Sequence, residues 1–270
     1  MLASPSVVPR CLTIAGSDSG GGAGIQADLK AFAALGCHGM SAIVALTAQS
    51  TTEVRSVHEA PPAFIRDELE VVFDDIGVDA AKTGMLFSRP IIETVAEFLA
   101  ARPVPLVVDP VMVAASGAKL LQDDAVEVLA GRLLPLATVV TPNLHEACVL
   151  AAVPYSEDAN REELAEKIRA LGASAVIVTG GHGTEAVDWL FDGDQHVPIP
   201  VERYESDATH GAGCTHSASL TALLARGESI EDAARGAARI ASEAVRAGLT
   251  EIGAGSGPVD VLNLAAVRSR

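Results

Sequence analysis

Residues 12–28, LTIAGSDSGGGAGIQAD, place a short apolar run, a glycine-rich loop and the start of an amphipathic segment one after another. The run at 12–15 is almost continuously apolar, which is typical of a strand that is covered on both faces of a sheet. Residues 26–35 then show the spacing of a helix with one apolar face. The stretch therefore predicts a β-strand that passes through a glycine-rich loop into an α-helix.

The same alternation continues through most of the chain. Short runs rich in valine, isoleucine and leucine indicate further buried strands, at 41–47, 78–82, 106–109, 137–141 and 175–179. Amphipathic segments of helix length lie between the runs, at 62–73, 89–101, 123–133, 144–151 and 161–171. Such alternation predicts parallel β-α-β units.

The C-terminal third departs from this pattern. Residues 186–191 and 195–201 flank Asp192-Gly193-Asp194, a strong signal for a β-hairpin. Two alanine-rich helices are predicted after it, at 214–225 and 230–247. The sequence thus predicts an α/β fold, a three-layer α/β/α sandwich whose mostly parallel central sheet gains an antiparallel edge hairpin near 186–201. Residues 1–270 show no repeats and no long linker, so we expect a single domain with 1–10 as a flexible N-terminus.

Composition and charge argue against nucleic-acid binding, a membrane span, secretion, a zinc site and a disulfide framework. A formal net charge of −16 and a pI near 4.7 argue against nucleic acid, which requires clustered lysines and arginines. No run approaches the roughly 18 apolar residues of a membrane span, and the N-terminus lacks the apolar centre of a signal peptide. The four cysteines show no C-x-x-C spacing, which opposes a zinc site and a disulfide framework. We therefore expect a soluble, cytoplasmic protein.

The most informative turn is Thr209-His210-Gly211-Ala212-Gly213-Cys214-Thr215, which leads directly into an apolar, helix-forming segment. Such a turn leaves backbone N–H groups unpaired at a helix N-terminus, where the partial positive charge of the helix can hold a phosphate. The alternative is a helix start that is glycine-rich for structural reasons alone. The remaining motifs decide between the two.

Residues at the ends of the strands matter because parallel sheets bind ligands at the carboxyl ends of their strands. Gly22-x-Gly24-x-x-Ala27 is similar to a dinucleotide fingerprint and makes an oxidoreductase a competing hypothesis. The second run, however, ends in Thr47-Ala48-Gln49-Ser50, without the acidic residue that holds the ribose of a nicotinamide dinucleotide. Gln49 instead offers an amide that can pair with a ring nitrogen and a neighbouring amine, or it is a solvated loop residue.

Four other strand ends carry candidates with both a structural and a functional interpretation. Met85 suits an apolar wall or plain core packing, and Asp109 suits a Mg²⁺ shell or an ordinary turn. Asn143 and Glu146 have the spacing of a capping box, and they gain a magnesium-phosphate role only together with the anion turn. Thr179-Gly180-Gly181-His182-Gly183 forms a backbone-exposed turn that suits close approach of a nucleotide.

Taken in order, these motifs closely resemble one family, the hydroxymethylpyrimidine/phosphomethylpyrimidine kinases of thiamine biosynthesis, within the ribokinase-like superfamily. The motifs that carry the resemblance are Ala15-Gly16-Ser17-Asp18-Ser19-Gly20-Gly21-Gly22-Ala23-Gly24-Ile25-Gln26-Ala27-Asp28, Thr47-Ala48-Gln49, Lys82-Thr83-Gly84-Met85-Leu86, Asp109-Pro110-Val111-Met112, Thr141-Pro142-Asn143, Gly180-Gly181-His182 and the turn 209–215. The resemblance extends from residue 12 to residue 258.

The resemblance implies a reaction and a set of ligands. The family uses ATP and Mg²⁺ to phosphorylate the hydroxymethyl group of 4-amino-5-hydroxymethyl-2-methylpyrimidine, and then converts that monophosphate to the diphosphate. By this resemblance, Gln49 would pair with the pyrimidine edge, and Asp28 would fix the glycine-rich loop. The apolar walls of the pyrimidine pocket would be Ala23, Met85 and Val111.

The resemblance also assigns residues to the phosphates. An anion hole at the helix N-terminus would consist of Gly211, Ala212, Gly213 and Cys214. Magnesium and the nucleotide would be held by Asn143, Glu146, Asp109, Thr179 and Gly181.

Cys214 stands where many ribokinase relatives place an aspartate as the base that deprotonates the attacking hydroxyl. A free thiol has a pKa of about 8.5, and a triphosphate beside it opposes the lowering effect of a helix N-terminus. Phosphoryl transfer passes through a loose transition state in most analyses, so positioning and charge neutralisation carry most of the acceleration. We therefore expect Cys214 to act mainly through its backbone N–H and only as a weak acid-base group.

Several positions depart from the family pattern. Thr179 and Ala115 stand where relatives typically carry lysine, so positive charge expected near the phosphates is missing. Ala212 replaces the usual threonine of the turn, which removes a hydroxyl but keeps the backbone donors. His216 is unusual at its position, and a surface role, a packing role and a phosphate contact are all open for it.

Two alternatives and one assembly state accompany this interpretation. A pyridoxal or pyridoxine kinase of the same branch would phosphorylate a similar flat, methylated heterocycle. A non-catalytic pyrimidine or nucleotide sensor would have lost turnover together with its lysines. The family habit of dimerising and the apolar helices predict a homodimer whose partners are the pyrimidine alcohol, its monophosphate and ATP, with no nucleic acid and no membrane.

Overall fold

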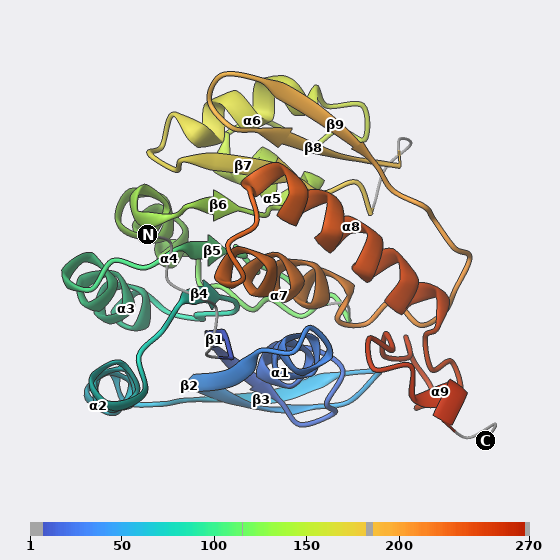
Figure 1. The fold of residues 1–270 in the computed structure, drawn as a ribbon, viewed down its shortest axis with the longest axis horizontal. Coiled ribbons are helices and arrows are strands. Elements are labelled where there is room, and N and C mark those ends of the chain that lie inside the picture. The colour runs from blue at the N-terminus through green and yellow to red at the C-terminus, as the bar shows by residue number, and fades with distance from the viewer. Residues whose placement is uncertain (1–7, 115, 182–185, 268–270) are drawn as a thin grey trace.

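One twisted sheet forms the centre of the molecule (Figure 1). The computed structural model describes residues 8–114, 116–181 and 186–267, and within these ranges nine strands form the sheet in the order β3-β2-β1-β4-β5-β6-β7-β8-β9. The predictions for residues 1–7, Ala115, His182 and Gly183 lie outside the described residues.

The strands follow the predicted runs closely. Their bounds are β1 Arg10–Asp18, β2 His38–Gln49, β3 Val54–Glu59, β4 Ala80–Thr83, β5 Leu106–Val108, β6 Val139–Val140, β7 Ala175–Val178, β8 Val187–Phe191 and β9 His196–Pro200. Strands β2, β1, β4, β5, β6 and β7 pair in parallel, as predicted. The predicted edge hairpin is confirmed as β8 and β9, which pair antiparallel next to β7.

The opposite edge of the sheet differs from the prediction. Strand β3 pairs antiparallel with β2 and was not predicted. Its sequence, VRSVHE, is polar, and most of its residues are exposed. A short, charged edge strand is the form that proteins use to discourage pairing with other chains, and it lacks the apolar run of a buried strand.

The helices also agree with the predicted segments. Their bounds are α1 Gly24–Ala34, α2 Pro62–Val71, α3 Arg89–Ala101, α4 Asp123–Val128, α5 Leu144–Leu150, α6 Arg161–Arg169, α7 Ala212–Ala225, α8 Ile230–Arg246 and α9 Leu264–Val267. Two predicted helices pass into π-helical turns, α2 into η1 (Val72–Ile76) and α4 into η2 (Leu129–Leu133), and a 3-10 turn, η3 (Leu134–Leu136), follows η2. In the described part of the chain, no helix combines the length and the apolar character needed to cross a membrane.

Two helical layers cover the two faces of the sheet, which confirms the three-layer sandwich. Helices α7 and α8 cross one face beside α1, as Figure 1 shows, whereas α2, α3, α5 and α6 cover the other. Strand β7 shows the division in one element, since Val176 and Val178 join one core cluster and Ala175 and Ile177 join the other. This two-sided burial explains why the parallel strands are continuously apolar.

The strand order reverses at β1, because β2 lies on one side of it and β4 on the other. Helix α7 packs against β1, β4 and β5. Parallel sheets of this kind open a crevice at the carboxyl ends of the strands where the order reverses. The glycine-rich loop after β1 and the turn before α7 both lie near this point.

Candidate active site

The turn before α7 has the geometry of an anion site. Gly211 is the N-cap of α7 and has φ +85°, a left-handed conformation that favours glycine. A Cβ at this position would collide with the carbonyl oxygen of Gly22, so only glycine allows the two loops to touch. The N–H of Ala212 donates to Thr209 O at 3.1 Å within the turn, which leaves the N–H groups of Gly213 and Cys214 to face a ligand.

Asp18 holds the glycine-rich loop. Its Oδ1 accepts the N–H of Gly20 at 2.8 Å, and its Oδ2 accepts the N–H groups of Gly22 at 3.1 Å and Ala23 at 2.8 Å. The prediction that Asp28 fixes this loop is therefore wrong. An aspartate followed by a glycine-rich turn is itself a signal for this arrangement, because aspartate commonly accepts backbone N–H groups two or more residues ahead.

His210 joins the glycine-rich loop to the anion turn. Its Nε2 lies 2.9 Å from Asp18 Oδ2 and 3.5 Å from Nε2 of Gln49, the last residue of β2. Burial raises the pKa of the Asp18 carboxyl, but hydrogen bonds from His210 and from the loop N–H groups outweigh burial and lower it. Asp18 is therefore an ionised carboxylate between the two loops.

A buried ion pair lies beneath the turn. Lys82, at 0% exposure, places Nζ 2.8 Å from Oδ1 of Asp28 and 3.8 Å from Oδ2 of Asp109. Although burial lowers the pKa of the Lys82 ammonium, the carboxylates of Asp28 and Asp109 raise it above its ordinary value. No role was predicted for Lys82 from the sequence. The signal was present, since a lysine within a strand predicted to be buried needs a charged partner.

Asp28 and Asp109 anchor this pair to the surrounding elements. Asp28 also accepts a hydrogen bond from Oγ1 of Thr13 at 2.6 Å, so it lies in the interior rather than at the surface of the pocket. Asp109 accepts a hydrogen bond from Oγ of Ser217 in α7 at 2.8 Å. The charged centre thus ties β1, β4, β5 and α7 together.

Cys214 is a neutral thiol in this environment. Burial raises the pKa of the Cys214 thiol to about 12, and the nearby ammonium of Lys82 lowers it only in part. The backbone N–H of Gly24, the first residue of α1, also lowers the pKa of the Cys214 thiol in part. The side chain therefore lies between the N-termini of α1 and α7, and it is protonated at neutral pH.

The predicted capping box is confirmed. Oδ1 of Asn143 accepts the N–H of Glu146 at 3.0 Å, and Oε2 of Glu146 accepts the N–H of Asn143 at 3.0 Å. Burial and the nearby carboxylate of Asp109 raise the pKa of the Glu146 carboxyl to about 8. Thr179 lies beside this cap, since its N–H donates to Pro142 O at 2.9 Å.

A second turn lies at the end of β7. The N–H of Gly180 donates to Oδ1 of Asp188 at 2.6 Å, and the carbonyl of Gly180 accepts Nη2 of Arg203 at 2.6 Å. Gly181 is exposed, with open space where a side chain would be. His216 is not a surface residue, because it is buried in α7 and its Nε2 lies 3.0 Å from Oδ2 of Asp188.

Two of the three predicted apolar walls, Ala23 and Met85, lie at the glycine-rich loop. Met85 is buried against Gly16, where a Cβ would collide with the Met85 methyl group. Ala23 is the half-buried N-cap of α1, and Val111 is half-buried against the core. The interactions described above therefore bring Gln49, Ala23, Met85, Asp109 and Cys214 to the same end of the sheet, where the carboxyl ends of the parallel strands lie.

Three buried threonine hydroxyls near the carboxyl ends of the strands indicate whether a polar ligand suits this end of the sheet. Oγ1 of Thr83, Thr141 and Thr215 has no hydrogen-bond partner among the described residues, and the same holds for Oγ of Ser219 further along α7. Thr83 ends β4, Thr141 directly follows β6, and Thr215 lies in the first turn of α7. Buried polar atoms are almost always hydrogen-bonded, so these hydroxyls fit the oxygens of a phosphate or of water bound to Mg²⁺.

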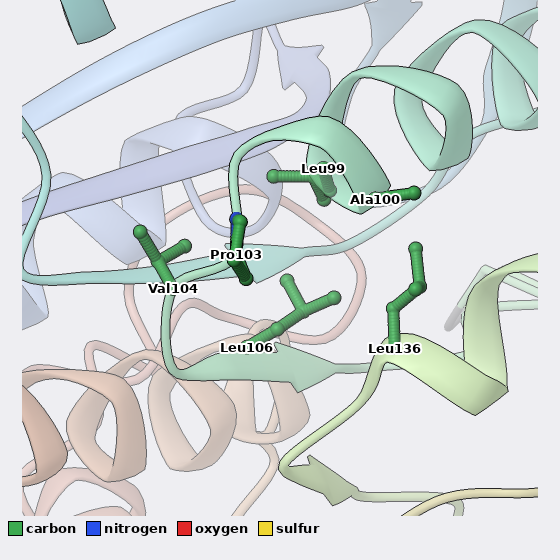
Figure 2. A pocket seen from close by; sticks show the side chains of 6 residues that line it. All are labelled: Leu99, Ala100, Pro103, Val104, Leu106 and Leu136. Carbon is green, nitrogen blue, oxygen red and sulfur yellow. The ribbon is translucent and has the colours of Figure 1, made fainter.

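A small apolar cavity lies away from this end of the sheet. Its volume is about 70 Å³, and its lining consists of Leu99, Ala100, Pro103, Val104, Leu106 and Leu136 (Figure 2). Leu106 is the first residue of β5, so the cavity lies at the amino end of the strand, whereas the candidate site lies at the carboxyl ends. Its lining side chains are all apolar, so it offers no side-chain group for catalysis.

The fold and the site together define a class, an α/β phosphotransferase of the ribokinase-like fold. A pyridoxal kinase from Bacillus subtilis, solved as an ADP complex, matches with a TM-score of 0.83 and 38% identity, covering 96% of this chain and 99% of that chain. The pyridoxal kinase from Staphylococcus aureus in complex with AMP-PCP and pyridoxal matches with a TM-score of 0.86 and 36% identity, covering 94% of each chain.

The sequence comparisons identify the family within this class. The profile described as phosphomethylpyrimidine kinase matches residues 18–260. A hydroxymethylpyrimidine/phosphomethylpyrimidine kinase from Streptomyces coelicolor is 45% identical over 257 residues, which cover 95% of this chain and 95% of that protein. The chain belongs to the phosphomethylpyrimidine kinase family. It is an ATP-binding kinase, and the competing hypothesis of an oxidoreductase is not supported.

Proposed function

We propose that the protein phosphorylates the hydroxymethyl group of 4-amino-5-hydroxymethyl-2-methylpyrimidine with ATP and Mg²⁺, and then phosphorylates the monophosphate to the diphosphate. One observation carries this proposal. The N-terminal turn of α7 is tied through His210 to Asp18 and Gln49, at the ends of β1 and β2, and through His216 and Asp188 to the turn at Gly180. It can therefore receive a phosphoryl group that moves from a nucleotide to a flat alcohol.

The residues of the chain supply positioning and charge. The N–H groups of Gly213 and Cys214 stabilise negative charge that develops on the phosphoryl oxygens. Lys82 places a fixed positive charge beneath them. The neutral thiol of Cys214 adds no negative charge to the site, so a loose transition state proceeds without a strong base.

Asp109 and Glu146 would hold Mg²⁺, which supplies charge neutralisation for the phosphates when bound. To bind Mg²⁺, the Glu146 carboxyl would have to lose its proton. The positive field of a divalent cation favours that loss, because an opposite charge nearby lowers the pKa of a carboxyl. Asn143, Thr179 and Gly181 would contact the nucleotide beside this pair.

The test is to identify the products. Purified protein with ATP, Mg²⁺ and the pyrimidine alcohol should give first the monophosphate and then the diphosphate, followed by ³¹P NMR and mass spectrometry. A product limited to the monophosphate would contradict the second step. Tight ATP binding without any phosphorylated product would favour the non-catalytic sensor instead.

A second candidate is pyridoxal phosphorylation, because both solved structures named above are pyridoxal kinases. Both substrates are flat heterocycles with a hydroxymethyl group. The comparison of kcat/KM for the two substrates decides between them. A preference for pyridoxal by more than tenfold would overturn the pyrimidine assignment.

We also propose that the enzyme acts as a homodimer in the cytoplasm. The four cysteines are free thiols, which suits a reducing compartment. Large apolar side chains are exposed near the β3 edge, with Leu46 at 51%, Phe64 at 56% and Val71 at 64% exposure. Light scattering with a mass near 55 kDa, twice the chain mass of 27.7 kDa, would support the dimer, and a mass of one chain would contradict it.

A further inference from the structure

The carboxamide of Gln49 has two polar neighbours that determine its orientation. Its Nε2 lies 3.5 Å from Nε2 of His210, and its Oε1 lies 3.3 Å from Oγ1 of Thr47. The oxygen and nitrogen of a carboxamide have nearly the same shape, so their placement follows from the hydrogen bonds of the neighbours. Each neighbour therefore has to be assigned as a donor or an acceptor.

His210 is a donor at Nε2. Its partner, Oδ2 of Asp18 at 2.9 Å, belongs to a carboxylate that also accepts the N–H groups of Gly20, Gly22 and Ala23. An ionised carboxylate only accepts hydrogen bonds, so Nε2 of His210 must carry the hydrogen. If the amide nitrogen of Gln49 faced this atom, an N–H of Gln49 and the N–H of His210 would oppose each other as two donors.

Thr47 is an acceptor toward Gln49. Its hydroxyl has one hydrogen, which is donated to Ser17 O at 2.9 Å. The lone pairs of Oγ1 remain, and they require a donor at the other end of the carboxamide. The single hydrogen on Nε2 of His210 is shared with or directed to Asp18, so this nitrogen has no lone pair for a Gln49 N–H. Rotation of the Gln49 amide by half a turn removes the opposition of two donors, because Oε1 then faces the N–H of His210 and Nε2 then donates to Thr47.

We propose that His210 is a specificity-determining residue that fixes the donor-acceptor order of Gln49, with Oε1 on the His210 side and the amide N–H on the Thr47 side. This inference rests on the proposed function and names the substrate pattern that the site selects. The pattern is a ring with an exocyclic amine next to an unprotonated ring nitrogen. The amine donates to Oε1, and the ring nitrogen accepts from Nε2.

The same donor-acceptor order of the Gln49 carboxamide also sets the orientation of the substrate ring. His210 directly precedes Gly211, so the Oε1 side of Gln49 is the side nearer to the anion turn. An amine paired there brings its neighbouring ring carbon to that side as well. In 4-amino-5-hydroxymethyl-2-methylpyrimidine this carbon carries the hydroxymethyl group, so one hydrogen-bond order both recognises the ring and directs its alcohol toward Gly213 and Cys214.

The experiment compares the 4-amino substrate with its 4-oxo analogue, which has the same shape but the reversed order of an acceptor at position 4 and an N–H in the ring. We measure kcat/KM for both in the wild-type protein, in His210→Met and in His210→Gln. Methionine removes the donor at similar size, and glutamine restores an N–H near the position of Nε2. The ratio of amino to oxo substrate should fall about tenfold or more in His210→Met, the equivalent of one oriented hydrogen bond, and His210→Gln should recover most of it.

The outcomes distinguish failure of the proposed function from failure of the role assigned to His210. If the wild-type protein phosphorylates neither pyrimidine, the proposed function fails. If it phosphorylates the amino substrate and the ratio is unchanged in His210→Met, with the KM for ATP and the melting temperature retained, the role of His210 is wrong. Should His210→Met fail to fold, Thr47→Val removes the acceptor at the other end of Gln49 and must lower the same ratio, and an unchanged ratio there overturns the proposal.

Discussion

Two aspartate–histidine pairs flank the anion turn, and they differ in what they hold. Asp18 pairs with His210 before the turn and accepts three N–H groups of the glycine-rich loop. Asp188 pairs with His216 after the turn and accepts one N–H group, that of Gly180. In the proposed function, the first pair would tie the turn to the acceptor side of the site, and the second would tie it to the nucleotide side.

The difference also extends to the histidines themselves. His210 lies within reach of Gln49, whereas Nδ1 of the buried His216 has no hydrogen-bond partner among the described residues. The first pair therefore has a further polar side chain beside it, and the second leaves a buried polar atom without a partner among the described residues. Because connected buried networks cost most to break, we expect the acceptor side to be the more sensitive to substitution.

Loss of Asp18 should have the largest effect. Asp18→Ala leaves three loop N–H groups and a buried imidazole without their acceptor, which we expect to lower the free energy of unfolding by about 3 kcal/mol. A displaced loop should also lower kcat/KM for the pyrimidine alcohol about 100-fold or more. Urea unfolding and steady-state kinetics measure both, with Asp18→Asn as the milder control. A loss below about 1 kcal/mol would show that the loop holds without this carboxylate.

Glu146 offers the opposite electrostatic case to Asp18, because its pKa is raised rather than lowered. The unfolded chain loses this proton near the ordinary value of 4.5 and the folded protein loses it near 8, so the folded state binds more protons between these values. The free energy of unfolding should therefore fall as pH rises from 5 to 8, by about 1 to 3 kcal/mol in total.

Urea unfolding in EDTA at a series of pH values measures this slope. Glu146→Gln should flatten it, whereas Glu163→Gln on the exposed first turn of α6 should leave it unchanged. The same slope in Glu146→Gln and in the wild-type protein would assign the pH dependence to another group.

Substitution of Asp188 should have a smaller effect that is confined to the nucleotide. Asp188→Asn weakens the support of Gly180, and we expect the KM for ATP to rise about tenfold, since a hydrogen bond to a charged group contributes 1.5 to 3 kcal/mol. The KM for the pyrimidine alcohol should stay within about twofold. Asp192→Asn, in the exposed hairpin turn, serves as the control. Equal changes in both KM values would remove the distinction between the two pairs.

Cys214, between the two pairs, should show the smallest effect. A thiol whose pKa is about 12 is protonated at neutral pH, so Cys214→Ala removes no base. We expect kcat to fall by less than about tenfold, because the backbone N–H groups of the turn remain. Circular dichroism confirms folding of the variant. Activity at background level in a folded Cys214→Ala protein would make the thiol the base.

Much of the fold could be predicted because the parallel strands are covered on both faces. Their apolar runs and the intervening amphipathic segments fixed the three layers, and Asp192-Gly193-Asp194 located the hairpin of β8 and β9. The edge strand β3 escaped prediction because it is short, polar and exposed. Edge strands of this kind carry little hydrophobic signal, since no second layer covers them.

The site could be predicted in part. The turn at Gly211 followed from local sequence, because a glycine-rich start of a helix has a local physical signature. The contact between Asp18 and His210 spans 192 positions, and that between Lys82 and Asp28 spans 54. Such pairings depend on the strand order around β1 and β4, so only the three-dimensional structure reveals which carboxylate holds the loop and which neutralises the lysine.

A crystal structure with AMP-PCP, Mg²⁺ and the pyrimidine alcohol tests the central claim most directly. We predict that the terminal phosphorus lies at the α7 turn, with its oxygens within hydrogen-bond distance of the N–H groups of Gly213 and Cys214, and that the hydroxymethyl oxygen points toward it from a ring paired with Gln49. A terminal phosphate bound elsewhere, with the N–H groups of this turn facing only solvent, would contradict the assignment of this turn as the place of phosphoryl transfer.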